Sequence, residues 1–151
     1  MSDGWPGAVV AAIVIFALVV DNVRTFRLRD VLTIGGLAAT VAVTAICSLV
    51  TGQPLSLVGA LVGAAGLFLL CFAAELVRPG TLGFGTVKST ALMGAATGGL
   101  GLAPWIGGLL GFGVATAVLG LIAWRVTRST LPTGPALVAG LVASVAVRLM
   151  A

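Results

Sequence analysis

The sequence predicts an all-α membrane protein: a bundle of six transmembrane helices, with both chain termini on the outer side of the membrane. Hydrophobic residues make up 60% of the 151-residue chain and charged residues 8%, and the mean hydropathy is +1.24. The apolar residues form long runs separated by short breaks, and the basic residues gather in alternate breaks. A soluble domain of this length cannot bury so much apolar surface, so we expect the runs to cross a lipid bilayer.

Six apolar runs are long enough to be considered as spans. In chain order they are Pro6–Val20, Leu32–Val50, Leu55–Leu76, Val87–Leu102, Pro104–Trp124 and Pro135–Leu149. The shortest lie near the lower limit of about 17 residues for crossing the ~30 Å hydrocarbon layer. No Lys or Arg precedes the first run and five more runs follow it, so we expect a span there and not a cleavable signal peptide. The break between Gly98 and Pro104 is compatible with two spans or with one kinked helix.

The basic residues predict the orientation. Seven of the eight lie in or beside the first, third and fifth breaks, namely Arg24, Arg27, Arg29, Arg78, Lys88, Arg125 and Arg128. The breaks "TGQP" and "GGLGLAP" carry no charge, and only Arg148 lies on their side. Because positively charged loops stay in the cytoplasm, we expect a multi-pass protein of the inner (cytoplasmic) membrane with outward termini. The net charge of +4 then indicates contact with anionic lipids and not nucleic-acid binding.

The absence of several residue types narrows the possible chemistry. The chain has no histidine and no tyrosine, which excludes histidine-based nucleophilic, zinc and proton-shuttle sites. The only carboxylates belong to Asp3, Asp21, Asp30 and Glu75, and Asp3 is expected on the outer side. Any acid–base chemistry at the cytoplasmic face must therefore use the other three.

Three segments resemble the signatures of the type IV prepilin peptidases, intramembrane aspartyl proteases that remove leader peptides from pilin precursors. "DNVRTFRLRDVLT" (Asp21–Thr33) resembles the first signature. "GFGTVKSTALMGAATGG" (Gly83–Gly99) resembles the second, which reads glycine–x–glycine–aspartate–valine–lysine. "LPTGPALVAG" (Leu131–Gly140) resembles the stretch that opens the last helix. The resemblance implies one domain over residues 1–151, a short family member, acting on pilin-like transmembrane leader peptides at the cytoplasmic face without a metal or organic cofactor.

The chain departs from this family at both catalytic positions. In an ungapped alignment, the two aspartate positions fall on Asn22 and Thr86. An aspartyl protease shares one proton between two close carboxylates, and neither an amide nor a hydroxyl can replace them at neutral pH. Losing one acid–base group typically costs ~10²–10⁴ in rate. We therefore expect a pseudoenzyme with impaired or lost proteolysis; a non-catalytic pilin-binding or secretion-assembly protein is the alternative. A small transporter has less support, because no charge is central in a span.

If the fold is retained, Asn22 and Thr86 should face each other across a cleft that opens to the cytoplasm. Asp21 is a possible stand-in for the first aspartate, but adjacent helical residues point about 100° apart. It would need a one-residue insertion or an unwound helix to take that role. The alternative is that Asp21 and Asp30 are solvated interfacial charges that neutralise nearby arginines.

Other residues near these signatures have two readings each. Gly83 and Gly85 would let the backbone approach a bound peptide, although glycines often mark a simple turn. Lys88 either orients a substrate backbone or lipid phosphate, or anchors the helix at the interface. Glu75 and Arg78 lie three residues apart, so we expect a local ion pair that anchors the helix at the cytoplasmic boundary.

Small residues recur four apart in three of the expected spans. The pairs are Gly59 with Gly63, Gly94 with Gly98, and Gly107 with Gly111. This spacing lets helix backbones approach closely in a membrane, so we expect these glycines at helix–helix contacts.

Overall fold

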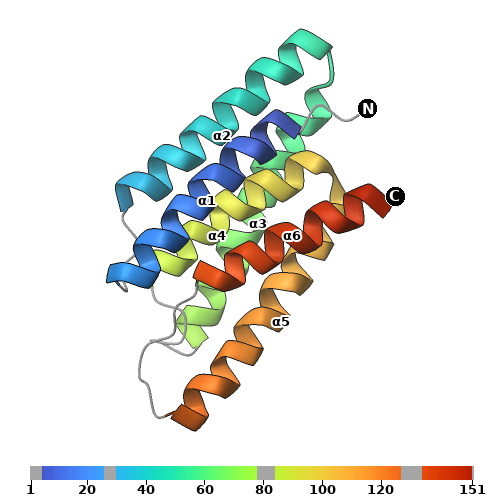
Figure 1. Cartoon of the computed structure of the whole chain (residues 1–151). Coiled ribbons are helices and arrows are strands. Elements are labelled where there is room, and N and C mark those ends of the chain that lie inside the picture. The colour runs from blue at the N-terminus through green and yellow to red at the C-terminus, as the bar shows by residue number, and fades with distance from the viewer. Residues whose placement is uncertain (1–4, 26–29, 78–83, 127–133, 151) are drawn as a thin grey trace.

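A computed structural model describes residues 5–25, 30–77, 84–126 and 134–150, without the side chains of residues 21–25, 30–32 and 123–126 (Figure 1). Within these ranges the chain is helical except for the short connections at residues 52–53 and 101. The helices are α1 (Trp5–Thr25), α2 (Asp30–Thr51), α3 (Pro54–Val77), α4 (Phe84–Leu100), α5 (Leu102–Val126) and α6 (Gly134–Met150). Each coincides with an expected span to within a few residues at its ends, so the six predicted helical segments are confirmed. Successive helices run in opposite directions, and the start of α1 and the end of α6 lie at the same end of the bundle.

Three of the described helices could cross a membrane by length and composition. They are Thr33–Thr51 in α2, Pro54–Val77 in α3 and Leu102–Ile122 in α5. The segments Trp5–Val20 and Gly134–Met150 are also apolar but shorter. These helices mark the chain as a membrane protein, whereas the number of passes stays a prediction.

Helix α4 occupies the centre of the bundle. It packs against each of the other five helices, and Figure 1 shows it enclosed between them. All its residues are buried except Phe84, Gly85 and Lys88. Its glycine and hydroxyl residues make it the least apolar helix of the bundle. A central helix has little contact with lipid, so it does not need an apolar surface.

Glycines allow α3 and α4 to touch backbone to backbone. A β-carbon at Gly59 would collide with the carbonyl oxygen of Gly98, and one at Gly63 would collide with that of Gly94. On the other side of the bundle, Gly111 of α5 lies against Ala143 of α6. The predicted small-residue contacts are therefore confirmed, and the structure adds which helices they join. Close approach of this kind supplies the van der Waals contact that holds membrane helices together.

The break between α4 and α5 separates two helices and is not a kink. Gly101 has a φ of +121°, a conformation that L side chains rarely adopt. Its N–H donates to the carbonyl of Gly98 at 3.1 Å, and its own carbonyl accepts from the N–H of Trp105 at 3.1 Å. Pro104 falls in the first turn of α5, where its missing N–H costs no helical hydrogen bond.

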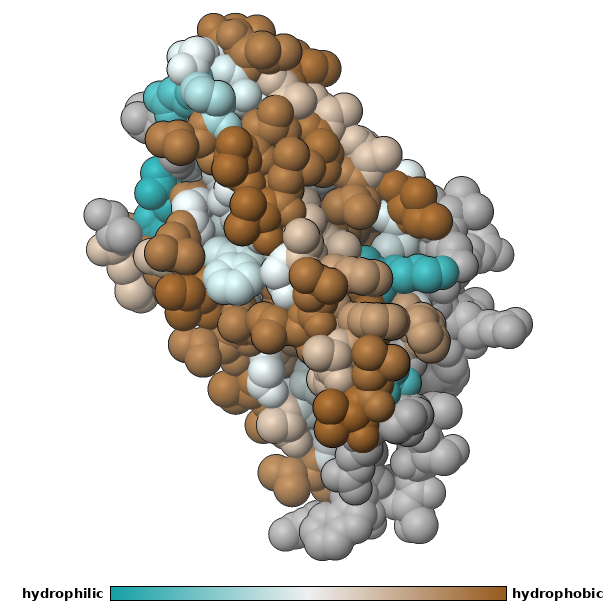
Figure 2. All heavy atoms as spheres, turned by 180° about the vertical axis from the view of Figure 1, so that it is seen from behind, coloured by the Kyte–Doolittle hydropathy of each residue, from teal (hydrophilic) through white to brown (hydrophobic). Residues whose placement is uncertain are grey.

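The outside of the bundle is apolar, and its interior combines an apolar core with buried polar residues. Phe16, Leu49 and Leu110 are exposed, and hydrophobic residues cover most of the face seen in Figure 2. The buried polar residues are Thr33, Thr40, Thr44, Ser48, Glu75, Thr86, Ser89, Thr90, Thr97 and Ser144. Several of these hydroxyls donate to a carbonyl one turn back in their own helix, as Thr44 does to Thr40 at 2.8 Å and Thr97 to Met93 at 3.0 Å. Small, internally bonded side chains of this kind suit an interior of closely packed helices.

Candidate functional site

The segments that resemble the first two signatures meet at one end of the bundle. The last turns of α1 and α3 and the first turns of α2 and α4 all lie there (Figure 1). We call it the Thr86 end. Because α1 and α4 pack together in opposite directions, the chain around Asn22 and the chain around Thr86 reach the same end.

Contacts along α3 and α4 establish which residues lie level with each other at the Thr86 end. The side chains of Cys71 and Thr90 are within hydrogen-bonding reach. Phe72, the residue after Cys71, and Phe84 at the start of α4 have their rings edge to face, with centroids 6.3 Å apart. Glu75 follows Cys71 by one helical turn, so it lies level with the first turn of α4.

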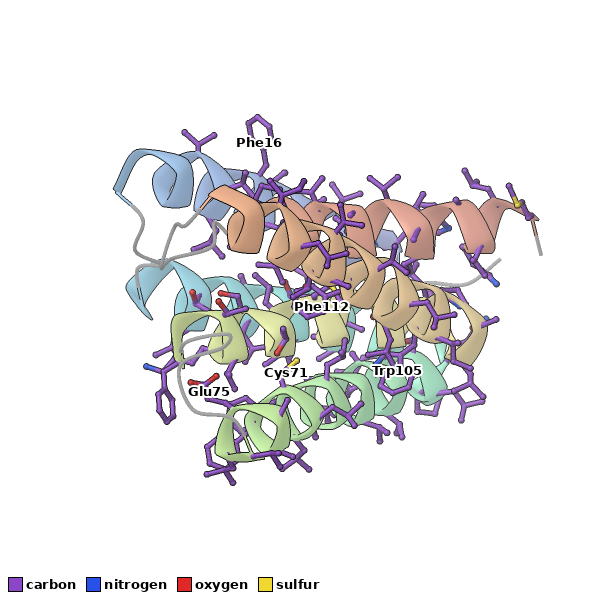
Figure 3. All side chains as sticks on the ribbon, turned by 90° about the horizontal axis from the view of Figure 1, so that it is seen from below. Phe16, Cys71, Glu75, Trp105 and Phe112 are labelled. Atoms are coloured by element: carbon purple, nitrogen blue, oxygen red, sulfur yellow. The ribbon has the colours of Figure 1, made fainter. Side chains whose placement is uncertain are left out.

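Glu75 points into the bundle. Its side chain is 7% exposed, and Figure 3 shows Cys71 and Glu75 both directed from α3 toward α4. Thr86, in the first turn of α4, is 3% exposed. Both residues, and also Lys88, have interaction partners in the structure. The N–H groups of a first helical turn carry a partial positive charge, so a carboxylate held level with them is stabilised.

Glu75 lies on the buried face of α3. We expected it to form an ion pair with Arg78 that anchors the helix at the cytoplasmic boundary, and that pair stays a prediction. Arg78 lies outside the described residues. The buried residues of α3 recur every three or four positions, which places Glu75 on the same face as Cys71 and Leu67. The buried residues are Ala60, Gly63, Leu67, Cys71 and Glu75.

Of the remaining candidate residues, the structure describes some fully, some by their backbone alone and one not at all. Gly85 and Lys88 are half-buried at the start of α4, and the Ser89 hydroxyl donates to the Gly85 carbonyl at 2.8 Å. Gly83 lies outside the described residues. The backbone of Asp21 and Asn22 belongs to α1, whose helix continues through Thr25 without unwinding.

The side chains of Asp21 and Asn22 are not described, so the expected approach of Asn22 to Thr86 stays a prediction. At the described part of the Thr86 end, the groups capable of polar chemistry are the carboxylate of Glu75, the ammonium of Lys88 and several hydroxyls. No cluster of three or more metal-ligating residues occurs among the described ones. A single carboxylate cannot share a proton in the manner of an aspartyl protease, but it can pair with a cation.

No protein-family model, curated protein or solved structure matches this chain. The resemblance to prepilin peptidases therefore rests on the three sequence segments.

Proposed function

We propose that this chain is a membrane protein of prepilin-peptidase architecture that binds pilin-like leader segments at its Thr86 end and cleaves them poorly or not at all. The observation that carries the proposal is the buried carboxylate of Glu75, level with Thr86 at the start of the central helix. An ionisable residue inside a membrane bundle generally marks a functional site. Its position, where the resembling signatures meet, connects that site with leader peptides.

The chemistry of the ligand fits this site. Leader peptides of this class are basic, and seven of the chain's eight basic residues lie in or beside the breaks that we expect at the cytoplasmic face. A cationic leader would therefore meet a positive rim unless a carboxylate attracts it. Glu75 supplies that carboxylate in a low-dielectric setting, where a charge pair is screened less than at the surface. Hydrolysis would need a second proton-transferring group, and Asn22 and Thr86 do not provide one.

The proposal includes a topology of six spans with both termini outside, in the inner membrane. It is supported by the alternation of basic and uncharged breaks and by the common end shared by the start of α1 and the end of α6. Cysteines introduced at Gly52 and Ser129 should be labelled from opposite sides of the membrane. Labelling from the same side would contradict six spans.

Binding and cleavage can be measured on the same purified protein in lipid. We expect leader peptides to bind without detectable cleavage. The isosteric change Glu75→Gln should weaken binding of a basic leader by roughly tenfold, because a charge-assisted contact becomes a neutral one. A matched leader with its Lys and Arg replaced by Gln should bind both proteins equally. Equal loss for both peptides would show that Glu75 supports only the fold.

The loss of catalysis has its own test. Asn22→Asp combined with Thr86→Asp should restore some hydrolysis, because the pair can then share a proton. Cleavage by the unaltered chain that Asp21→Ala abolishes would show that Asp21 is a working acid and that the protein is an enzyme.

A further inference from the structure

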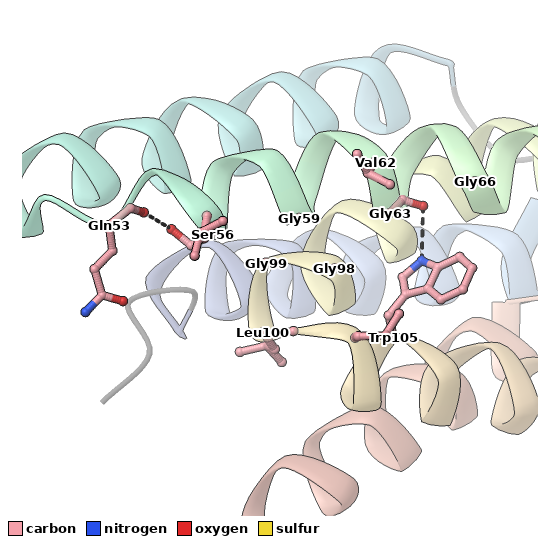
Figure 4. Close-up of a pocket in the computed structure, with 13 residues that line it drawn as sticks. Gln53, Ser56, Gly59, Val62, Gly63, Gly66, Gly98, Gly99, Leu100 and Trp105 are labelled. Atoms are coloured by element: carbon pink, nitrogen blue, oxygen red, sulfur yellow. Dashed lines mark hydrogen bonds between the residues drawn. The ribbon is translucent and has the colours of Figure 1, made fainter.

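A second site lies at the opposite end of the bundle from Thr86. A groove of about 400 Å³ runs between α3, the end of α4 and the start of α5 (Figure 4). This volume falls within the range of roughly 300–1,000 Å³ that is typical of ligand pockets. We call it the α3–α5 groove.

The backbone of α3 at three glycines lines the floor of the α3–α5 groove. Gly59, Gly63 and Gly66 lie along it, and Trp105 of α5 forms a wall. The indole Nε1 of Trp105 donates to the carbonyl oxygen of Gly63 at 3.2 Å, which fixes the ring against α3. One wall of the groove is therefore held in place by a hydrogen bond to its floor.

The groove changes in polarity along its length. At one end lie Gln53 and Ser56, beside the turn that joins α2 to α3; the Ser56 hydroxyl donates to the Gln53 carbonyl at 3.0 Å. The rest of the lining is glycine, aliphatic side chains and the Trp105 ring, without a charged residue. From Ser56 to Gly66, α3 rises about 15 Å, which is half of the ~30 Å hydrocarbon thickness. The groove thus extends from a polar end through the depth of one lipid leaflet.

The sides of the groove face lipid. Its walls belong to two of the helices apolar enough to span a membrane. Three lining residues, Leu55, Val62 and Leu102, are between 64% and 83% exposed. Large aliphatic side chains exposed on such helices contact acyl chains in a bilayer, so the groove opens into hydrocarbon and not into water.

We infer that the α3–α5 groove binds one acyl chain of a membrane phospholipid, from the leaflet nearest Gln53. The chain lies along the glycine floor against Trp105, and the glycerol–ester region of the lipid lies beside Gln53 and Ser56. The length of the groove, its change in polarity and its opening toward the bilayer all match a phospholipid acyl chain. The inference does not depend on leader binding, which takes place at the other end of the bundle.

Photo-crosslinking tests this inference on the full chain in phosphatidylcholine vesicles. The probe is phosphatidylcholine with a diazirine at the middle of one acyl chain. We expect labelling to concentrate on the segment 59–66 of α3 and on Trp105. Val62→Trp fills the groove and should lower this labelling by about tenfold, equivalent to losing the burial of roughly two methylenes.

The matched control is Leu61→Trp, the neighbouring position on α3, which is 50% exposed and does not line the groove. It should leave the labelling unchanged. Even labelling of all exposed faces of α3 and α5 would indicate ordinary boundary lipid only and would overturn the inference. Unchanged labelling in Val62→Trp, or a second copy of the chain crosslinked across the groove, would overturn it equally.

Discussion

Helices α4 and α5 are adjacent in sequence, yet one is almost entirely buried and the other is largely exposed. In α4, every residue is buried except Phe84, Gly85 and Lys88, and the helix is rich in glycine and hydroxyl groups. In α5, only 11% of an 18-residue apolar stretch within Leu102–Ile122 is buried. The more apolar helix is thus the more exposed one, which is the reverse of the pattern in a water-soluble protein.

The difference shows what hydrophobicity means in this chain. In water, apolar side chains gather inside because burial removes them from solvent. In a bilayer the solvent is itself apolar, so Leu and Val on α5 gain little from burial and are placed outside. The interior of the bundle, which α4 occupies, can then contain small residues, which allow close helix packing, and polar residues such as Thr86. A polar site and a tight packing centre therefore occupy the same helix.

The largest expected effect comes from a charge on the exposed face of α5. Val114 lies at the middle of α5 and is 64% exposed. Val114→Arg should disfavour membrane insertion of the helix by about 2.5–3.5 kcal/mol, because the charge enters hydrocarbon. In a soluble protein the same exposed change would fall within about ±0.5 kcal/mol. Insertion efficiency of α5 in a translocon assay measures it.

The matched control for Val114→Arg is Gln53→Arg, in the turn between α2 and α3. It should insert normally, because the new charge lies near the interface. Equal insertion of both variants would show that the centre of α5 faces water, and the contrast between α4 and α5 would then have another cause.

A smaller effect is expected from one added methyl group on each helix. Gly94→Ala places a β-carbon against the Gly63 carbonyl of α3, whereas a β-carbon at Gly113 of α5 meets nothing within 4 Å. Gly94→Ala should destabilise the bundle by about 1–3 kcal/mol through overpacking. Gly113→Ala should be neutral or stabilise by up to about 1 kcal/mol, because alanine favours helix. Thermal unfolding in nanodiscs compares the two, and similar shifts would contradict the backbone contact.

The sequence predicted the helices well because their signals are local. Apolar runs marked α1 to α6, whereas the glycine-rich break was compatible with two spans or one kinked helix until the structure separated α4 from α5. The burial of Glu75 and the central place of α4 were not predicted. Near Glu75, α3 reads FLLCFAAELV and is apolar on every side, so no periodic pattern shows which face meets a neighbour. Pairing of helix faces is set by contacts distant in sequence, such as Gly63 with Gly94, which only the structure supplies.

The smallest expected effect concerns the hydrogen bond that joins α5 to α3. Trp105→Phe removes the hydrogen bond from Nε1 to the Gly63 carbonyl but keeps an aromatic ring in place. We expect a destabilisation of about 0.6 kcal/mol, the average for a side-chain hydrogen bond between membrane helices. The effect is small because an unfolded helix in the membrane finds other partners for the same group. Trp5→Phe, at the 36%-exposed start of α1, is the control and should change nothing. Thermal unfolding in nanodiscs measures both; a loss as large as that of Gly94→Ala would mean that α5 depends on this contact as much as α3 and α4 depend on their glycines.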